Sequence, residues 1–407
     1  MLRLNSSLRI RSPIETLSAA RRAAARLGIT RVTDTTRLDR LGIPVFAGIR
    51  PGALKGSLCV NAGKGITPIE AQVGAYMEAI EFALAEPGAS QVQVVMATSR
   101  DVLDGASRPD AILDFCPIVR KSFDPSEPLA CVEARDIVNH QDTLVPAELV
   151  LLPFAQRHPG TGSFGSHSNG LASGNNVPEA TLHGLLEVIE RDIRSFLTLD
   201  GRCDVVQKST VPASCRALVE RIESAGLDIL VRTRVNEFGL PFFEAILFDP
   251  DSFELFQFAA GYGCHLVPEI ALVRAITEAV QTRLSWIHGG RDDLAADLKD
   301  VPHGGSDRAW RERSRTAFRS MELRGPVVDF GAGVGDIAEP ASPDDAVELV
   351  LDRLKREGMN HVCRTIYTQP DEDLAVVRVT VPRLEHLANH SHRVGPRMRA
   401  ALRRKHA

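Results

Sequence analysis

Three stretches of the chain place apolar residues at helical spacing, and each stretch carries carboxylates among those apolar residues. The stretches are Ala75–Glu81, Glu187–Asp192 and Arg274–Arg283. Residues three or four positions apart share a helix face, so Glu78 lies beside Glu81, and Glu187 lies beside Glu190. Carboxylates in apolar surroundings are costly unless they meet cations or solvent. The pattern therefore predicts three helices that each present acidic groups to a polar partner.

The third stretch has its own shared face, formed by Arg274, Glu278 and Gln281. Glu78 and Glu81 alone would be ordinary solvated helix positions, and the combination of three such helices is what favours a site. If the helices converge, their side chains form an oxygen-rich cage that suits Mg²⁺ and a nucleoside triphosphate.

Helix and strand signals cover most of the chain. Ser12 is followed by Pro13 and Glu15, and Thr67 by Pro68 and Glu70, which is typical of capped helix starts. We expect helices at 13–27, 67–84, 179–199, 268–288 and 344–357, and a helical tail from 396. We expect strands at 29–33, 43–49, 58–61, 91–97, 149–154, 227–235, 242–248, 252–259, 361–367 and 374–381. The Gly-, Ser- and Asn-rich segment 157–176 is predicted to be a loop.

This order of elements favours an α+β fold with mixed and antiparallel sheets. The strands between 227 and 259 alternate with short turns, which is typical of an antiparallel meander. The helices at 67–84 and 179–199 share a Glu-x-x-Glu pattern, which is consistent with pseudo-duplicated halves.

Composition narrows the class of protein. The chain has 407 residues, of which 44% are hydrophobic and 25% charged, as in ordinary globular proteins. Its net charge of -4 gives no reason to expect a nucleic-acid partner. Seven scattered cysteines without a Cys-x-x-Cys pair favour reduced thiols in the cytoplasm. No long apolar run opens the chain or approaches a membrane span, so we expect neither a signal peptide nor a membrane segment.

Four motifs stand in a fixed order along the chain. They are Gly63–Pro68 with Met77–Glu81, Ser168–Gly174, His183–Asp192, and Arg274–Arg283. In sequence, order and spacing they resemble the YcaO family, and four ordered motifs are more specific than any one of them. The resemblance covers positions 55 to 385. It implies a YcaO-type fold whose long helices converge on a nucleotide site.

The resemblance implies chemistry that depends on ATP and Mg²⁺. Members of this family phosphorylate the oxygen of a peptide amide, a nucleophile then replaces that oxygen, and phosphate leaves. The metal ligands implied are Glu78, Glu81, Glu187 and Glu190, with Glu179 as a further acidic position. The ATP ligands implied are Lys64, Ser168, Asn169, Asn175, Arg191, Glu278, Gln281 and Arg283. Lys64 precedes a capped helix start, where anions are favoured, but it lacks the spacing of a P-loop.

Three departures from the family pattern qualify this interpretation. Ala75 and Phe82 stand where the family's first helix usually has Ser and Arg, so one hydroxyl and one guanidinium are missing. The chain lacks the Pro-x-Pro-x-Pro tail of azoline-forming members, and we expect no fused partner domain before residue 55. This standalone form resembles the subgroup associated with TfuA proteins. That subgroup implies a TfuA-type partner, a sulfur donor and a thioamide product.

The expected organisation is an N-terminal helix and strands over 1–54, an ATP-binding catalytic domain over 55–385, and a basic tail over 386–407. Two alternative functions stay open. One is an azoline-forming cyclodehydratase that acts on Cys, Ser or Thr of a ribosomal peptide. The other is a non-catalytic ATP-binding accessory protein, which the departures at Ala75 and Phe82 keep open. Apolar helices and the family are consistent with a homodimer, but the sequence identifies neither the oligomeric state nor the substrate.

Overall fold

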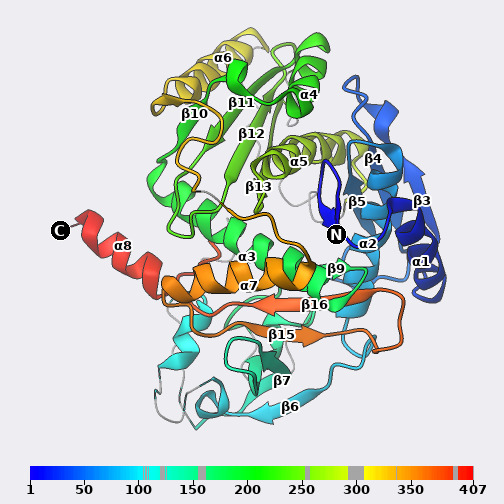
Figure 1. Cartoon of the computed structure of the whole chain (residues 1–407), viewed down its shortest axis with the longest axis vertical. Helices are drawn as coiled ribbons and strands as arrows, with labels where there is room; N and C mark the ends of the chain where they lie inside the picture. Colours follow the sequence, from blue (N-terminus) through cyan, green and yellow to red (C-terminus); the bar gives the residue numbers. More distant parts are fainter. Residues whose placement is uncertain are drawn as a thin grey trace.

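A computed structural model describes residues 1–103, 105, 108, 110–119, 124, 126–154, 162–252, 257–291, 307–335, 337–387 and 393–406. Its helices lie on the faces of mainly antiparallel sheets, so the predicted α+β class is confirmed (Figure 1). The predicted tail at 386–407 is only partly covered, because residues 388–392 and 407 lie outside the described residues.

The N-terminal part combines a short hairpin, two helices and a three-stranded sheet. The hairpin pairs β1 (Leu2–Arg3) with β2 (Leu8–Arg9), and the antiparallel sheet has the order β3 (Arg31–Asp34), β4 (Val45–Ile49), β5 (Val60–Lys64). Helix α1 (Pro13–Arg26) packs on α2 (Pro68–Ala85), which covers β4 and β5. The predicted caps are present, since Ser12 and Glu15 form a capping box and Thr67 accepts from the Glu70 N–H.

A five-stranded sheet forms the second part. Its order is β13 (Phe258–Cys264), β12 (Phe242–Phe248), β11 (Asp228–Thr233), β10 (Asp204–Val206), β14 (Val327–Val328). Helices α4 (Ala213–Ser224) and α5 (Pro268–His288) pack against it, and α6 (Asp307–Glu322) places Phe318 on Phe248. The strand expected at 252–259 starts only at Phe258, and residues 253–256 lie outside the described residues.

A six-stranded sheet forms the third part. Its order is β6 (Val94–Ala97), β7 (Leu129–Asp136), β15 (Cys363–Ile366), β16 (Ala375–Thr380), β9 (Leu171–Gly174), and β8 (Gln141–Pro146) pairs with β7. Helix α3 (Val177–Asp200) packs on β9 and β16, and α7 (Pro343–Arg356) packs on α3. Helix α8 (Pro396–His406) extends away from the body (Figure 1). The strand β9 lies in the segment that was predicted to be a loop.

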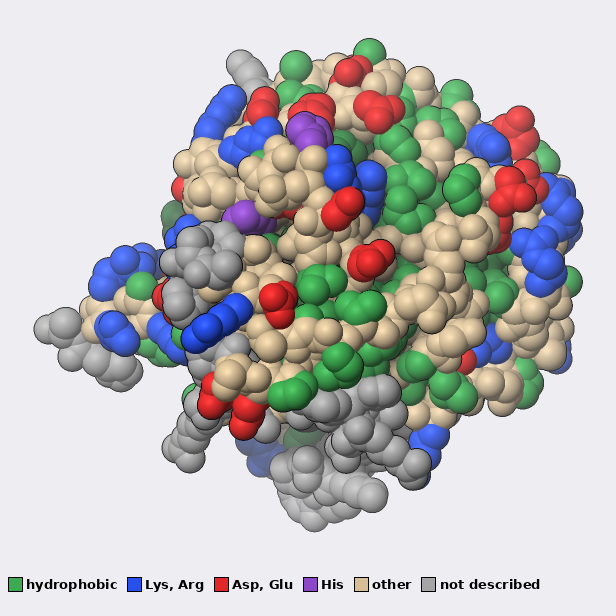
Figure 2. Space-filling model, turned by 90° about the horizontal axis from the view of Figure 1, so that it is seen from below, with side chains coloured by type: hydrophobic (Ala, Val, Ile, Leu, Met, Phe, Trp, Pro, Cys, Tyr) green, Lys and Arg blue, Asp and Glu red, His purple; other side chains and the backbone are tan. Residues whose placement is uncertain are grey.

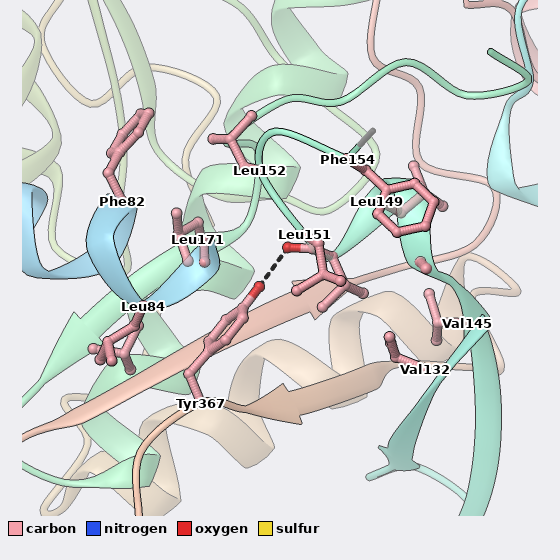
Figure 3. Packing of buried hydrophobic residues seen from close by; sticks show 14 of the residues in the cluster. Phe82, Leu84, Val132, Val145, Leu149, Leu151, Leu152, Phe154, Leu171 and Tyr367 are labelled. Atoms are coloured by element: carbon pink, nitrogen blue, oxygen red, sulfur yellow. Dashed lines mark hydrogen bonds between the residues drawn. The ribbon is translucent and has the colours of Figure 1, made fainter. Parts of the chain in front are cut away.

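The predicted strand at 149–154 is wrong. Residues Ala147–Leu149 form a short 3₁₀ turn, and the apolar residues that follow form a buried irregular segment. The Val150 carbonyl accepts hydrogen bonds from the Tyr367 hydroxyl at 2.6 Å and from Arg378 at 3.0 Å. Side chains therefore satisfy this backbone in place of a neighbouring strand, while its leucines pack around the Tyr367 ring (Figure 3).

Two strand–helix units show the closest internal repetition. A Cβ atom on Gly63 of β5 would lie 2.2 Å from the backbone oxygen of Ala71 in α2. A Cβ atom on Gly263 of β13 would lie 2.0 Å from the backbone oxygen of Ala271 in α5. Only glycine allows a helix to approach a strand so closely. The repetition is thus clearest between β5–α2 and β13–α5, with the same sequence separation of strand and helix.

The structure locates the charged side chains and the thiols. Among the described residues on the face seen in Figure 2, acidic and basic side chains are interspersed and form no single basic surface. The seven cysteines all lie among the described residues, and none of them forms a disulfide there. Within the described part of the chain, no helix is both long enough and apolar enough to cross a membrane.

Candidate functional site

A cavity of about 380 Å³ lies among the three acidic helices. Its walls come from the N-terminal segment, from β5 with α2, from β9 with α3, and from α5. Seven carboxylates from the three helices line this one cavity, and five of them, Glu78, Glu81, Glu187, Glu190 and Glu278, lie in the three acidic stretches. The structure therefore brings together the acidic residues that the helical spacing singled out.

Backbone groups hold these carboxylates in place. The Ala62 N–H donates to Glu78 at 2.6 Å, and the Tyr262 N–H donates to Glu278 at 3.4 Å. These two contacts occupy equivalent positions in the β5–α2 and β13–α5 units. On α3, Glu190 accepts from the Cys264 N–H at 3.1 Å. Each helix is thus tied to a strand by one of its own acidic side chains.

A hydroxyl reaches the site from a strand that the sequence did not predict. Ser173 of β9 donates its hydroxyl to Glu81 at 2.5 Å. Ala75, which stands where the family has Ser, is fully buried. Phe82, which stands where the family has Arg, packs in a hydrophobic cluster. A hydroxyl is therefore present beside the first acidic helix, although α2 does not supply it.

Two of the cations that line the cavity, Lys64 and Arg191, act most strongly on Glu278. The Lys64 ammonium lies 2.5 Å from a Glu278 carboxylate oxygen. Burial opposes the charged form of Arg191, but Glu190 and Glu187 outweigh burial and raise the pKa of Arg191. Burial also opposes ionisation of Glu278, but Lys64 and Arg191 outweigh it and lower the pKa of Glu278. Glu278 is thus the carboxylate that the protein's own cations best neutralise.

In the other four carboxylates, neighbouring cations and hydrogen bonds do not outweigh burial. Burial raises the pKa of Glu81 to about 8, although the Ser173 hydroxyl opposes the shift. Burial is also the main cause of the raised pKa values of Glu78, Glu187 and Glu190. A cation that entered the cavity would remove the cost of ionising these groups. The electrostatics of the site therefore fit a bound metal ion.

The spacing of these groups limits how such an ion could be held. Within the described residues, no three His, Cys, Asp or Glu side chains are grouped closely enough to bind one metal ion together. Mg²⁺ in nucleotide sites is usually held by one or two carboxylates, with phosphate oxygens and water completing its shell. The cavity is consistent with that arrangement.

The remaining predicted residues divide into two groups. Ser168, Asn175 and Gln281 line the cavity, and the Gln281 amide donates to the Ala62 carbonyl at 2.8 Å. Asn169 and Arg283 are not among the described lining residues.

Arg283 is held elsewhere in the structure. Its guanidinium pairs with Asp39 and Asp249, each at 2.9 Å, and its side chain is only 3% exposed. Five residues separate it from Glu278, which rotates it by about 140° around the helix. That rotation turns Arg283 away from the face that carries Glu278, so we leave it out of the proposed nucleotide contacts.

Glu179 lines the cavity but is already engaged. It accepts from Arg9 at 2.9 Å, from the Ile10 N–H at 3.0 Å and from the Asn175 N–H at 3.1 Å. These contacts bind the N-terminal hairpin to the first turn of α3. Glu179 is therefore a weaker candidate for a metal ligand than Glu78, Glu81, Glu187 and Glu190.

Several lining residues were not singled out by the sequence. Arg9 and Arg11 belong to the N-terminal segment, whose hairpin has no strong sequence signal. His183 lies one helical turn before Glu187, and its Nε2 lies 3.3 Å from Arg274. Trp286 lies at the end of α5, two turns beyond Glu278. Helical periodicity alone places His183 and Trp286 on the acidic faces.

Comparison with known proteins defines the class to which this fold and cavity belong. The family model described as YcaO cyclodehydratase, ATP- and Mg²⁺-binding, matches residues 62–385. The chain therefore belongs to the YcaO family.

Two relatives match almost the whole chain. An uncharacterised protein of Methanothermobacter thermautotrophicus is 33% identical over 392 residues, which are 96% of this chain and 98% of the relative. An uncharacterised protein from the tfuA 3′ region of Rhizobium leguminosarum bv. trifolii is 32% identical over 394 residues, or 92% of this chain and 88% of the relative.

Solved structures share the fold. YcaO from Methanopyrus kandleri, bound with AMPPCP and Mg²⁺, superposes with a TM-score of 0.75 at 23% identity and 97% coverage of both chains. A heterocyclase in complex with substrate and cofactor gives a TM-score of 0.73 at 20% identity, and covers 97% of this chain and 55% of the heterocyclase. At these identities the likeness establishes the fold.

Proposed function

We propose that the chain binds ATP with Mg²⁺ in this cavity and uses it to activate a backbone amide of a peptide. The observation that carries the proposal is the convergence of acidic side chains from α2, α3 and α5 on one cavity that also holds Lys64 and Arg191. The description of the family and the ligands of the Methanopyrus kandleri structure support it. The departures at Ala75 and Phe82 do not remove any of the five carboxylates.

The proposed metal ligands are drawn from Glu78, Glu81, Glu187 and Glu190. Their raised pKa values reflect carboxylates buried without enough positive charge, which a divalent cation would supply. Bound there, Mg²⁺ would neutralise the charge of the phosphates and hold them in line with the amide.

The proposed nucleotide ligands are Lys64, Ser168, Asn175, Arg191, Glu278 and Gln281. Lys64 is pre-positioned by Glu278, and an incoming triphosphate offers it a more highly charged partner. Arg191 keeps its charge in the buried site because of the surrounding carboxylates. These two cations are placed to bind phosphate oxygens, while the walls of the cavity exclude water from the transferring group.

The chemistry proceeds by replacement of an oxygen atom. The amide oxygen attacks the terminal phosphorus of ATP, the bond to the bridging oxygen breaks, and ADP leaves. A nucleophile then adds to the amide carbon, and the former amide oxygen departs as part of phosphate. With hydrosulfide as the nucleophile, the sum is amide, hydrosulfide and ATP giving thioamide, ADP and phosphate. Positioning and charge neutralisation are the contributions that the protein must make.

We propose a thioamide product made with a TfuA-type partner and a sulfur donor. The support is the Rhizobium relative, whose gene lies in a tfuA 3′ region. Azoline formation is the second candidate, because the family description and the heterocyclase structure refer to that chemistry. Mass spectrometry of the peptide product distinguishes them: a thioamide gains mass as sulfur replaces oxygen, whereas an azoline loses water.

The test of the core proposal is ADP release in the presence of candidate peptide and partner. Wild-type protein should release ADP only when Mg²⁺ and peptide are both present. Glu190→Gln should abolish this release, while Glu133→Gln, on the exposed side of β7, should retain it. Full activity in Glu190→Gln would refute the placement of the metal. Binding of ATP without any peptide-dependent ADP release would favour the accessory-protein alternative.

A further inference from the structure

The two lining residues with benzene or indole rings take no part in the chemistry proposed above. Among the described lining residues, these are Phe82, with a phenyl ring, and Trp286, with an indole ring. Phe82 is buried in the hydrophobic cluster that α2 shares with the six-stranded sheet. Trp286 is half-buried and belongs to none of the described hydrophobic clusters. Its ring therefore offers apolar surface that the core does not use.

Trp286 extends the same helix face that carries Glu278. The two residues are eight positions apart, which corresponds to about 12 Å along the helix at ~1.5 Å per residue. Thr282 and Ser285 line the cavity between them and carry hydroxyls. An extended nucleoside triphosphate spans such a distance, with its phosphates at Glu278 and its base near Trp286. The hydroxyls then lie beside the ribose.

Along α5, Arg274 lies four positions before Glu278, on the other side of it from Trp286. Arg274 lies 3.3 Å from the His183 ring nitrogen, and Arg9 pairs with Glu179 at 2.9 Å. These side chains line the cavity and already have polar partners. Charged, paired groups favour anions or a polar peptide backbone, whereas a purine base gains more from a flat apolar ring. Arg291, five positions after Trp286, also lines the cavity, so the flat ring of Trp286, and not a difference in charge between the two sides, predicts where the base lies.

We propose, on the basis of the ATP site proposed above, that Trp286 stacks on the nucleobase and that the terminal phosphate points towards Arg274. Trp286 is then a positioning residue for the nucleotide. The peptide amide approaches from the side of the N-terminal hairpin, where Arg9 and Arg11 line the cavity.

Isothermal titration calorimetry tests this with ATP and with inorganic tripolyphosphate, each in the presence of Mg²⁺. Loss of one stacking contact weakens base binding about ten-fold. We expect Trp286→Ala to weaken ATP binding by about this factor and Trp286→Phe to restore it, because a phenyl ring still stacks. Tripolyphosphate has no base, so its affinity should be the same in all three proteins.

A second measurement uses the fluorescence of the same residue. The chain has two tryptophans, and the indole N–H of the other one, Trp310, donates to Gln257 at 2.9 Å. In a Trp310→Phe background, ATP should change the emission of Trp286, and tripolyphosphate should leave it unchanged.

Two results would overturn the inference while leaving the proposed function intact. One is unchanged ATP affinity in Trp286→Ala. The other is an equal loss of ATP and tripolyphosphate affinity, which would indicate a general distortion of the cavity. If neither ligand binds the wild-type protein, the proposed ATP site itself is refuted, and the two failures are thereby distinguished.

Discussion

Replacing Glu81 with Gln should stabilise the ligand-free protein at alkaline pH. Burial raises the pKa of Glu81 from 4.5 to about 8, and the neighbouring Glu78 and Glu187 add to the effect. The folded protein therefore keeps a proton on Glu81 in a pH range where the unfolded chain has released it. Glutamine has nearly the same shape, can accept the Ser173 hydrogen bond through its amide oxygen, and does not ionise.

The direction in which the free energy of unfolding changes with pH follows from the number of protons bound by the folded and unfolded states. Between pH 4.5 and about pH 8 the folded state binds more protons at Glu81 than the unfolded state does, so stability falls as pH rises through this range. This contribution is fully present below pH 4.5 and is lost once the pH has passed about 8. This rise in the pKa of Glu81 corresponds to an upper limit of about 5 kcal/mol, which water in the cavity reduces.

The assay is urea unfolding without Mg²⁺, from about pH 5 to about pH 9. The free energy of unfolding of the wild-type protein should fall across this range, and that of Glu81→Gln should fall much less. A shallower slope should remain in the variant, because burial also raises the pKa of Glu190. The control, Glu133→Gln on the exposed side of β7, should follow the wild type. Equal slopes in wild-type protein and Glu81→Gln would refute the assigned protonation.

Three further predictions concern Lys64, Arg283 and the binding of Mg²⁺. Lys64→Met should raise the KM for ATP about ten-fold in the ADP-release assay, since it removes a charge-assisted contact; an unchanged KM would contradict its phosphate role. Arg283→Met should lower the free energy of unfolding by about 3 kcal/mol, because Asp39 and Asp249 lose a buried partner, yet leave the KM for ATP unchanged. A raised KM with unchanged stability would return Arg283 to the nucleotide site. Mg²⁺ should raise the unfolding temperature of the wild-type protein more at about pH 8 than at about pH 6, and this difference should shrink in Glu187→Gln; an equal shift at both pH values would contradict the metal placement.

The elements that the sequence predicted best are those with local signals. The cap at Thr67 followed by Pro68, and Pro268 at the start of α5, fix where two acidic helices begin. Once those helices exist, the spacing of Glu78 and Glu81 decides which face they share. These statements need only neighbouring residues, and the structure agrees with them.

The elements that the sequence missed depend on distant partners. The apolar segment at 149–154 has the composition of a buried strand, but Tyr367 and Arg378 satisfy its backbone from more than 200 positions away. The N-terminal hairpin is held at the cavity by the ion pair of Arg9 with Glu179, which are 170 positions apart. No local pattern encodes such contacts, so the N-terminal wall of the cavity could not be predicted.

The position of Arg283 shows a limit of a different kind. It lies inside a family motif, yet helix geometry turns it away from Glu278 and towards Asp39. The family motif implied Arg283 as an ATP ligand, whereas the helical period places its side chain on a different face of α5 from Glu278.

The most direct test of amide activation follows the oxygen atom. A substrate peptide whose backbone carbonyls carry a heavy oxygen isotope is incubated with the protein, ATP, Mg²⁺, a sulfur donor and the TfuA-type partner, and the released phosphate is analysed by mass spectrometry. Phosphorylation of the amide oxygen predicts that one heavy oxygen appears in phosphate for each thioamide or azoline formed. Product formation with unlabelled phosphate would contradict the account.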